Sequence, residues 1–425
     1  MNSTKIKWQD PAIFAKKIAE NYQGNWVFLY SALANVKKNS KSYIALFEED
    51  RFCGEDFENL VKKITKIEKG WWFGGINYEA GEQFENIFNQ QKSMVNFPNF
   101  FFVKFRVVLV FDHQKKTIKI ITKSKKLIDE ILSYKLSKSN FKSPKIENFN
   151  SNFTNQEYLS SIKKIQEMIS NGDFFQANLT RKFYGKFTQK LSNLQSFQLF
   201  LKLVEVSPSN YLAYANFDEK FILSSSPELF LKSKNNLVLS SPIKGTIARG
   251  LSKKEDLENK KYLQNSTKEK AENLMIVDLM RNDFARFCEP SSVRVKKLFE
   301  ITKYQMIYHL SSDIVGKIDS SKNIFDALKA CFPAGSMTGA PKIKSMEILH
   351  QIEKMPRGLY SGAFGFVKNC NEMNFSVVIR TLLVENDFFE FQVGGGITYD
   401  SSPEKELAET YSKGRAIFKI LNLKN

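Results

Sequence analysis

Two patterns of hydrophobic residues alternate along the 425-residue chain. Before residue 135, aromatic strand-like runs dominate, among them GNWVFLYSA, KSYIALFEE and GWWFGGINYEAG. After residue 155, NQEYLSSIKKIQEMISNGD repeats Tyr158, Ile162 and Ile165 at helical spacing and ends at an Asn-Gly pair, which predicts an amphipathic helix. The next segment, FFQANLTRKFYGKF, alternates as a strand does. Helices and strands therefore alternate in this second part.

A polar segment separates the two parts. YKLSKSNFKSPKIENFNSN is rich in Ser, Lys and Asn and has little apolar periodicity, so it predicts a connector. A chain of this length accommodates roughly two to three domains. We expect an N-terminal region over residues 1–150 and a second domain over residues 151–425. Within the latter, FSVVIRTLLVE predicts one continuous strand, and SSPIKGTIARG predicts a strand end followed by a turn at Gly245-Thr246.

Composition restricts the class of protein. With 42% hydrophobic and 25% charged residues, the chain is globular and not disordered. The N-terminus lacks the apolar stretch of a signal peptide, and FFFVKFRVVLVF is too short to span a bilayer and is interrupted by Lys104 and Arg106. Four cysteines form no CxxC pair or metal-binding spacing, which favours a reducing compartment. We expect a cytoplasmic protein without a membrane partner.

The net charge is +18, from 63 basic and 45 acidic residues. A basic surface attracts phosphate, so a nucleic-acid-binding protein is one interpretation. The lysines, however, are spread along the chain, and no nucleic-acid-binding motif is present. HQKKTIKIITKSKK alternates apolar and basic residues, as a half-exposed strand does. The charge therefore favours an anionic small-molecule substrate over a nucleic-acid partner.

Two pairs of glutamates have the same spacing. KEKAENLMIVDLMRNDFARFC predicts a long helix in which Glu269 and Glu272 share one side. SSPEKELAETYSKGRAIFKIL predicts a second helix, with Glu406 and Glu409 again three residues apart. If the pairs face one another, they offer oxygen ligands to a hard cation such as Mg²⁺. Two solvated acidic faces would have the same spacing, so both interpretations stay open.

Further segments suit an anionic ligand. FPAGSMTGAPKIKSMEIL is a small-residue loop that leads into a helix near Pro341, whose backbone N–H groups can hold a carboxylate. QVGGGITYD places Gly394, Gly395 and Gly396 after a strand, where the missing side chains allow a ligand to approach the backbone. Arg380, alone in an apolar strand, needs a partner, either an internal acid or a ligand carboxylate.

Seven motifs occur in one order: SSSPELFL, PIKGTIARG, AENLMIVDLMRNDFAR, FPAGSMTGAPK, PRGLYSGAFGF, VVIRTLLVE, and VGGGITYD with the adjoining SSPEKELAETYSKGRAI. Together they resemble the chorismate-utilising enzymes, a family that includes anthranilate synthase component I, aminodeoxychorismate synthase component I, isochorismate synthase and salicylate synthase. The resemblance covers about residues 155–422 and is looser before residue 150. It implies an α+β fold of the anthranilate synthase component I type, in which antiparallel β-sheets pack as a sandwich with helices outside.

The resemblance also implies roles for individual residues. Glu272 and Glu409 match the acids that bind Mg²⁺, with Glu269 and Glu406 holding the ion through water. Glu228 in SSPELF matches the acid that protonates the departing C4 hydroxyl of chorismate. The residues that match substrate-binding positions or lie in the substrate-binding loop are Ser336, Thr338, Tyr360, Arg380, Gly394, Gly395, Gly396 and Lys413.

Three further positions bear on the reaction. His309 in MIYHLSSDIVG matches a pocket histidine, although a core histidine fits the pattern equally well. Gln176 stands where isochorismate and salicylate synthases use a lysine to activate water, which disfavours water addition at C2. Lys244 in PIKGT stands where anthranilate synthases usually have alanine, and it resembles the aminodeoxychorismate synthase form. Its amine would attack C2 before ammonia adds at C4.

The expected function is therefore Mg²⁺-dependent amination of chorismate at C4, which gives 4-amino-4-deoxychorismate for p-aminobenzoate and folate biosynthesis. These residues contain no glutaminase signature, so ammonia is expected from a glutamine amidotransferase subunit or as free ammonium. One alternative is anthranilate synthase component I, in tryptophan biosynthesis, which Lys244 disfavours. The other is a basic scaffold or nucleic-acid-binding protein, which the presence of every motif acid disfavours.

Overall fold

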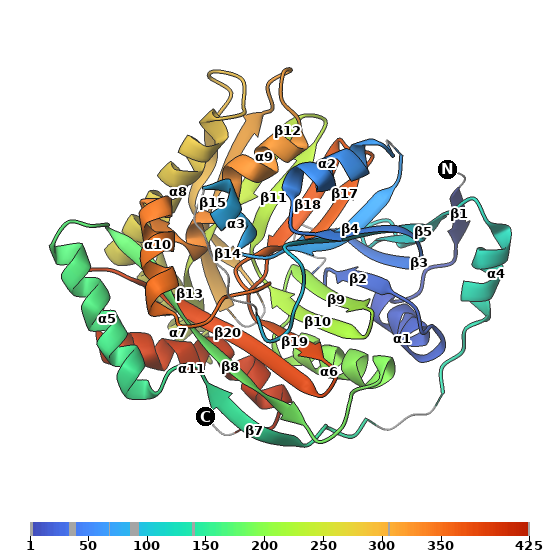
Figure 1. Ribbon diagram of the computed structural model, residues 1–425, viewed down its shortest axis with the longest axis horizontal. Coiled ribbons are helices and arrows are strands. Elements are labelled where there is room, and N and C mark those ends of the chain that lie inside the picture. The colour runs from blue at the N-terminus through green and yellow to red at the C-terminus, as the bar shows by residue number, and fades with distance from the viewer. Residues whose placement is uncertain are drawn as a thin grey trace.

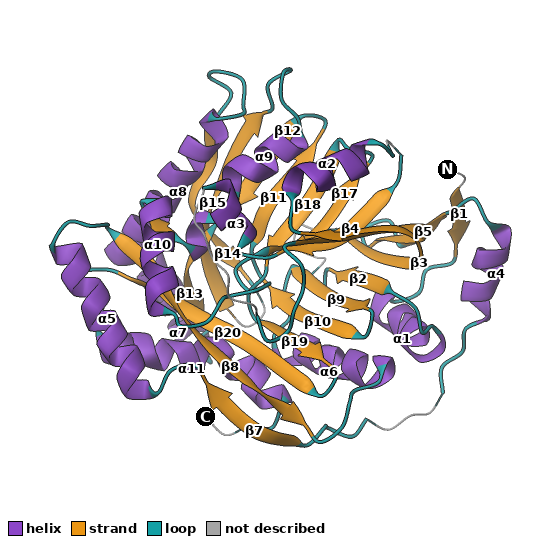
Figure 2. Ribbon diagram, viewed as in Figure 1, coloured by secondary structure: helices purple, strands orange, loops and turns teal. Residues whose placement is uncertain are grey.

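The structure is a computed structural model in which antiparallel strands form the interior and helices cover the outside (Figures 1 and 2). This arrangement confirms the expected α+β sandwich. The described residues are 3–33, 40–67, 69–85, 93–137, 141–304 and 307–423.

The helices are α1 (Pro11–Asn21), α2 (Phe57–Thr65), α3 (Ala80–Phe84), α4 (Lys125–Ser133), α5 (Asn155–Ser170), α6 (Asn193–Val206), α7 (Lys253–Asn265), α8 (Thr267–Ala285), α9 (Ile324–Cys331), the 3₁₀ turn η1 (Gly335–Met337), α10 (Lys342–Ile352) and α11 (Pro403–Ile420). The first strands are β1 (Ser3–Ile6), β2 (Trp26–Tyr30), β3 (Lys41–Gly54), β4 (Trp71–Ile76), β5 (Phe100–Asp112), β6 (Thr117–Ile121), β7 (Ile146–Ser151), β8 (Gln176–Phe187), β9 (Tyr211–Phe217) and β10 (Lys220–Ser226). The later strands are β11 (Leu229–Lys234), β12 (Leu237–Ser241), β13 (Ile243–Ala248), β14 (Arg294–Lys303), β15 (Ile307–Lys317), β16 (Gly339–Ala340), β17 (Ala363–Lys368), β18 (Glu372–Val377), β19 (Thr381–Glu385) and β20 (Phe388–Ile397).

The strands form two layers that share the long strands β3 and β5. One layer runs in the order β8, β20, β19, β10, β9, β2, β3, β5 and β6. The other runs in the order β3, β5, β4, β17, β18, β11, β12 and β15, with β13 and β14 also on β15. The layers diverge at β5, because its first residues pair with β4 and its last residues pair with β6.

Aromatic and aliphatic residues fill the space between the layers, among them Phe73, Phe101 and Phe364. Helices α1, α6 and α11 cover the outer face of one layer, and α2, α8 and α9 cover that of the other (Figure 1). Close packing of this kind resists local shifts, so it fixes the strand ends from which the candidate site is built.

The predicted helix after residue 155 is α5, and the strand after it is β8. Thr154 and Glu157 form a capping box at the start of α5, and Asn171 is its C-cap. The prediction of a polar connector is partly wrong, because the last residues of that segment form β7, which pairs with β8. Phe149 of β7 stacks on Phe183. This aromatic contact stabilises a strand that the polar sequence did not predict. Residues 138–140 of the connector lie outside the described residues.

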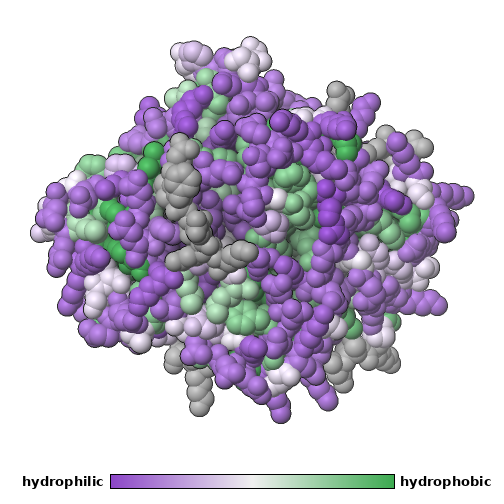
Figure 3. Space-filling view, viewed as in Figure 1, coloured by the Kyte–Doolittle hydropathy of each residue, from purple (hydrophilic) through white to green (hydrophobic). Residues whose placement is uncertain are grey.

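Strands from the two expected sequence regions pair with one another: β2 pairs with β9, and β4 pairs with β17. The boundary at residue 150 stays a prediction. The face seen in Figure 3 is largely hydrophilic, with hydrophobic residues in scattered patches. In the part of the chain that is described, no helix has both the length and the apolar character needed to cross a membrane.

Candidate active site

The three glycines at the end of β20 lie in a strand and pair with residues 178–180 of β8. A Cβ atom on Gly395 would lie 2.9 Å from Glu406 Oε2. On Gly396 it would lie 2.2 Å from Gln176 Nε2 and 3.6 Å from Lys244 Nζ. The absent side chains therefore leave room for an acid from α11 on one side and for Gln176 and Lys244 on the other.

Lys244 lies in β13 and not before a turn, which corrects the expectation for SSPIKGTIARG. The pairing of β13 with β15 shifts between Ile243 and Thr246, which marks a β-bulge. Gly245 in this bulge has a φ of +88°, a conformation that favours glycine. The bulge changes the direction of the Lys244 side chain. Its Nζ lies 3.6 Å from the position that a Cβ atom on Gly396 would occupy.

Glu228 lies between β10 and β11, and only 5% of it is exposed. Ser336 Oγ donates a hydrogen bond of 2.7 Å to its Oε1. Burial raises the pKa of Glu228 to about 7, although the Ser336 hydrogen bond and the Lys244 charge act in the opposite direction. A carboxyl group with such a pKa is partly protonated at neutral pH and can serve as a general acid.

Arg380 lies between β18 and β19, so the single strand predicted for FSVVIRTLLVE is wrong. The chain leaves the strand conformation after Val377, and Arg380 has a φ of +51°. Burial lowers the pKa of the Arg380 guanidinium, while the charge of Glu228 raises it. Among the described residues, Arg380 has no hydrogen bond or ion pair from its side chain, which favours a ligand over an internal acid as its partner.

Both predicted glutamate pairs lie on the helices expected for them: Glu269 and Glu272 on α8, and Glu406 and Glu409 on α11. Burial raises the pKa of Glu269, as do the charges of Glu272 and, across the site, Glu409. Burial and the charge of Glu409 raise the pKa of Glu406. The two pairs therefore lie near one another, and Lys268 Nζ is 3.9 Å from Glu272 on α8 and 3.9 Å from Glu406 on α11.

The four glutamates, Glu269, Glu272, Glu406 and Glu409, are called the acidic cluster below. Lys413 neutralises part of its negative charge. Lys413 Nζ lies 2.5 Å from Glu409 Oε1 and donates to the Gly394 carbonyl at 2.7 Å. Burial would raise the pKa of Glu409, but the Lys413 ammonium lowers it below its usual value. Lys413 thus holds one acid of α11 against the end of β20.

The acidic cluster fits Mg²⁺ in its donor chemistry. In the described part of the chain, no three His, Cys, Asp or Glu side chains are already arranged around one metal position. Mg²⁺ usually keeps several waters and takes one or two carboxylates, so it does not need such a cage. The absent side chain of Gly395 lets Glu406 and Glu409 approach the end of β20, because a Cβ atom there would lie 2.9 Å from Glu406 Oε2 and 3.9 Å from Glu409 Oε1.

The small-residue loop is held by a buried arginine that the sequence analysis did not single out. Arg357 donates to the Met337 carbonyl at 2.7 Å and to the Asn178 carbonyl at 2.8 Å, and it pairs with Glu353. The loop then enters α10 directly after Pro341, as predicted. Arg357 therefore ties the loop, β8 and the segment before Tyr360 together; its place in PRGLYSG was the available signal.

Three further predicted residues, Thr338, Tyr360 and His309, are buried. Thr338 Oγ1 donates to the Gly335 carbonyl at 3.3 Å. Tyr360 is 5% exposed, and burial raises its pKa. His309 Nδ1 and Thr246 Oγ1 are 2.7 Å apart, which joins the histidine to the strand that carries Lys244.

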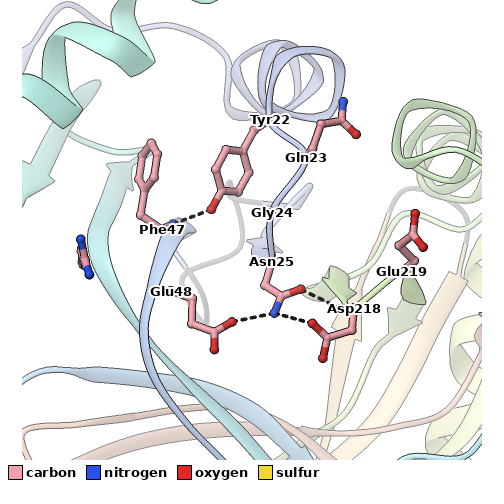
Figure 4. A pocket seen from close by; sticks show the side chains of 9 residues that line it. Tyr22, Gln23, Gly24, Asn25, Phe47, Glu48, Asp218 and Glu219 are labelled. Carbon is pink, nitrogen blue, oxygen red and sulfur yellow. Dashed lines mark hydrogen bonds between the residues drawn. The ribbon is translucent and has the colours of Figure 1, made fainter.

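A hollow of about 460 Å³ lies elsewhere, around Asn25, Phe47 and Asp218 (Figure 4). Asn25 Nδ2 donates to Glu48 and Asp218, and Arg51 pairs with both acids. The predicted site residues do not line this hollow. We therefore place the candidate active site at the end of β20 and not here.

Comparisons with known proteins identify the family of this chain. A profile of the chorismate binding enzyme family matches residues 16–419. Anthranilate synthase component 1 of Aquifex aeolicus is 32% identical over 94% of this chain and 87% of its own. Aminodeoxychorismate synthase component 1 of Escherichia coli is 33% identical over 83% of this chain and 77% of its own. The crystal structure of anthranilate synthase component I from Streptococcus pneumoniae superposes with a TM-score of 0.79 at 27% identity and covers 89% of this chain and 92% of its own.

The chain therefore belongs to the chorismate binding enzyme family. The profile begins at residue 16, so it takes in most of the N-terminal region, where the motifs alone gave only a loose resemblance. The predicted family and fold are confirmed. The relatives carry the names of two different enzymes at nearly equal identity, so they do not choose between the two reactions.

Proposed function

We propose that this enzyme aminates chorismate at C4 to give 4-amino-4-deoxychorismate. The observation that carries the proposal is the position of Lys244. Its ammonium lies beside Gly396 and influences the pKa values of Glu228 on one side and of Glu269 and Glu409 on the other. Within the described residues, Lys244 Nζ has no hydrogen bond or ion pair that would hold it in a structural role.

The proposed reaction has two substitutions. The Lys244 ammonium first gives a proton to solvent. Its neutral amine then bonds to C2, the ring double bonds shift, and the C4–O bond breaks as Glu228 gives its proton to the leaving hydroxyl. Ammonia then bonds to C4, the double bonds shift back, and the bond between C2 and Lys244 breaks. The product keeps the ammonia nitrogen, water leaves, and Glu228 regains a proton from the product ammonium or from solvent. Covalent catalysis of this kind divides one difficult substitution into two easier ones.

Chorismate carries two carboxylates, and the site offers positive partners for them. Arg380 lies within the electrostatic influence of Glu228, Lys413 donates to the Gly394 carbonyl, and Gly395 and Gly396 leave the backbone without side chains. We propose that Glu272 and Glu409 hold Mg²⁺, with Glu269 and Glu406 binding it through water. When bound, the ion would neutralise the substrate's ring carboxylate.

Gln176 supports ammonia over water as the nucleophile. Its side chain is 2% exposed, and its Oε1 has no hydrogen-bond partner among the described residues. An amide cannot take a proton from water as a lysine amine can. Its free oxygen can instead accept a hydrogen bond from ammonia or from the substrate.

The second candidate is the anthranilate synthase reaction, because a relative with that name is as similar as the aminodeoxychorismate synthase. Lys244 favours C4 over C2, since an amine already bonded to C2 blocks that carbon. The name "component 1" of both relatives supports a second subunit, and we propose a glutamine amidotransferase that supplies ammonia.

Product analysis tests the proposal. The enzyme is incubated with chorismate, Mg²⁺ and ammonium, and the products are separated by chromatography. We expect 4-amino-4-deoxychorismate, and we expect Lys244→Ala to reduce it roughly 100-fold or more, the scale on which a positioned catalytic group acts. Lys254→Ala, at an exposed lysine of α7, is the matched control. Anthranilate as the main product, or full activity of Lys244→Ala, would contradict the proposal.

A further inference from the structure

Lys268 lies at the start of α8 and bridges the two acidic pairs. Its Nζ is 3.9 Å from Glu272 Oε1 on its own helix and 3.9 Å from Glu406 Oε1 on α11. The acids are poorly exposed, at 14% and 5% of their side chains, whereas the lysine is 56% exposed. A largely solvated cation therefore lies between two poorly exposed carboxylates from different helices.

Lys268 lies where the negative charges of four glutamates come together. Glu269, Glu272, Glu406 and Glu409 bring four carboxylates together, and Lys413 pairs with Glu409 alone. In the described part of the chain, Lys268 is the cation within ion-pair distance of acids on both helices. Without a positive charge there, the carboxylates of α8 and α11 repel each other, because like charges a few Å apart raise each other's energy.

The contacts of Lys268 are also easily broken. A nitrogen-to-oxygen distance of 3.9 Å exceeds that of a good hydrogen bond. An exposed ion pair of this kind gains little, because water screens it and the long side chain loses freedom. A divalent ion with carboxylate ligands can therefore displace the ammonium into solvent.

We propose that Lys268 is a built-in counter-cation that competes with Mg²⁺ for this position. In the metal-free enzyme its charge offsets part of the repulsion between the α8 and α11 pairs. When Mg²⁺ binds, the Lys268 side chain moves into solvent. The single charge of the ammonium is then replaced by the double charge of the metal ion. The inference rests on the proposed Mg²⁺ site, and it adds that this lysine sets the affinity of that site.

Calorimetric titration of the whole chain with Mg²⁺ alone tests the inference. Lys268→Met should bind Mg²⁺ roughly tenfold more tightly, because a positive charge about 4 Å from the acids no longer opposes the ion. Lys268→Arg keeps the charge and should stay close to wild type. Lys270→Met removes a charge from the same helix at a residue that lies over the Phe299 ring, and it should also stay close.

If wild type binds Mg²⁺ and Lys268→Met binds it equally or more weakly, the counter-cation role is wrong and the metal site stands. If wild type does not bind Mg²⁺ at millimolar concentrations, the proposed metal site is wrong and this inference with it. Because Lys268 is exposed, its substitution leaves the core intact.

Discussion

Replacing Glu228 by glutamine should make the protein more stable at high pH while removing its activity. Burial raises the pKa of Glu228 from its ordinary 4.5 to about 7. Between these pH values the folded protein holds a proton that the unfolded chain has lost. The stability that Glu228 contributes is therefore highest below pH 4.5 and falls as the pH rises to about 7. Above pH 7 the folded protein bears the full cost of a buried carboxylate.

The size of the effect follows from the shift. A change from 4.5 to about 7 corresponds to about 3 kcal/mol, since one pKa unit is about 1.4 kcal/mol. Glutamine carries no charge and can still accept the Ser336 hydrogen bond, but its amide nitrogen needs a new acceptor, at a cost of about 1 kcal/mol. Glu228→Gln should thus gain about 2 kcal/mol at pH 8. For a chain of this size, that raises the unfolding midpoint by about 2 °C.

Thermal unfolding at pH 5 and pH 8 measures this gain for wild type, Glu228→Gln and the control Glu205→Gln. Glu205 is exposed on α6, so its substitution should change neither midpoint. Glu228→Gln should gain at pH 8 and lose that gain at pH 5, and it should be inactive because an amide has no proton to give to the leaving hydroxyl. A midpoint for Glu228→Gln that is lowered equally at both pH values would refute the assigned protonation state.

Two further predictions concern the pH dependence and the metal. In wild type, kcat/KM should fall as the pH rises through about 7, because the proton of Glu228 is lost; a profile that stays flat to pH 9 would exclude Glu228 as the acid. Glu272→Gln should abolish turnover, leave the unfolding midpoint nearly unchanged without Mg²⁺, and lose most of the stabilisation by Mg²⁺ plus chorismate; unchanged activity would reject Glu272 as a metal ligand.

Local sequence patterns predicted the elements whose periodicity and ends were both visible. Helix α5 has buried residues at helical spacing, a capping box and a terminal Asn-Gly pair, so local and tertiary preferences agree. The sequence pattern did not predict strand β7. Its two apolar residues, Ile146 and Phe149, stabilise a strand only because β7 pairs with β8 and Phe149 packs on Phe183. Such contacts between distant segments are invisible to a local pattern.

The same limit applies to the candidate site. The spacing of the glutamates placed each pair on one side of a helix, but nothing local showed that α8 and α11 approach each other. The break at Arg380 was hidden, because a non-glycine residue at positive φ leaves no signal in an apolar run. The bulge at Gly245 was mistaken for a turn, since both use a glycine at positive φ. At both positions the irregular backbone brings a charged side chain, Lys244 or Arg380, close enough to lower the pKa of Glu228.

The measurement that tests the central claim most directly is the intact mass of the enzyme given chorismate and Mg²⁺ without ammonia. The account predicts an adduct heavier by chorismate less one water, which peptide mapping places on Lys244 and which Lys244→Ala lacks. Lys244→Arg should form no adduct and no product, because a guanidinium stays protonated and cannot act as a nucleophile. An adduct on another residue, or an active Lys244→Arg enzyme, would contradict covalent catalysis by Lys244.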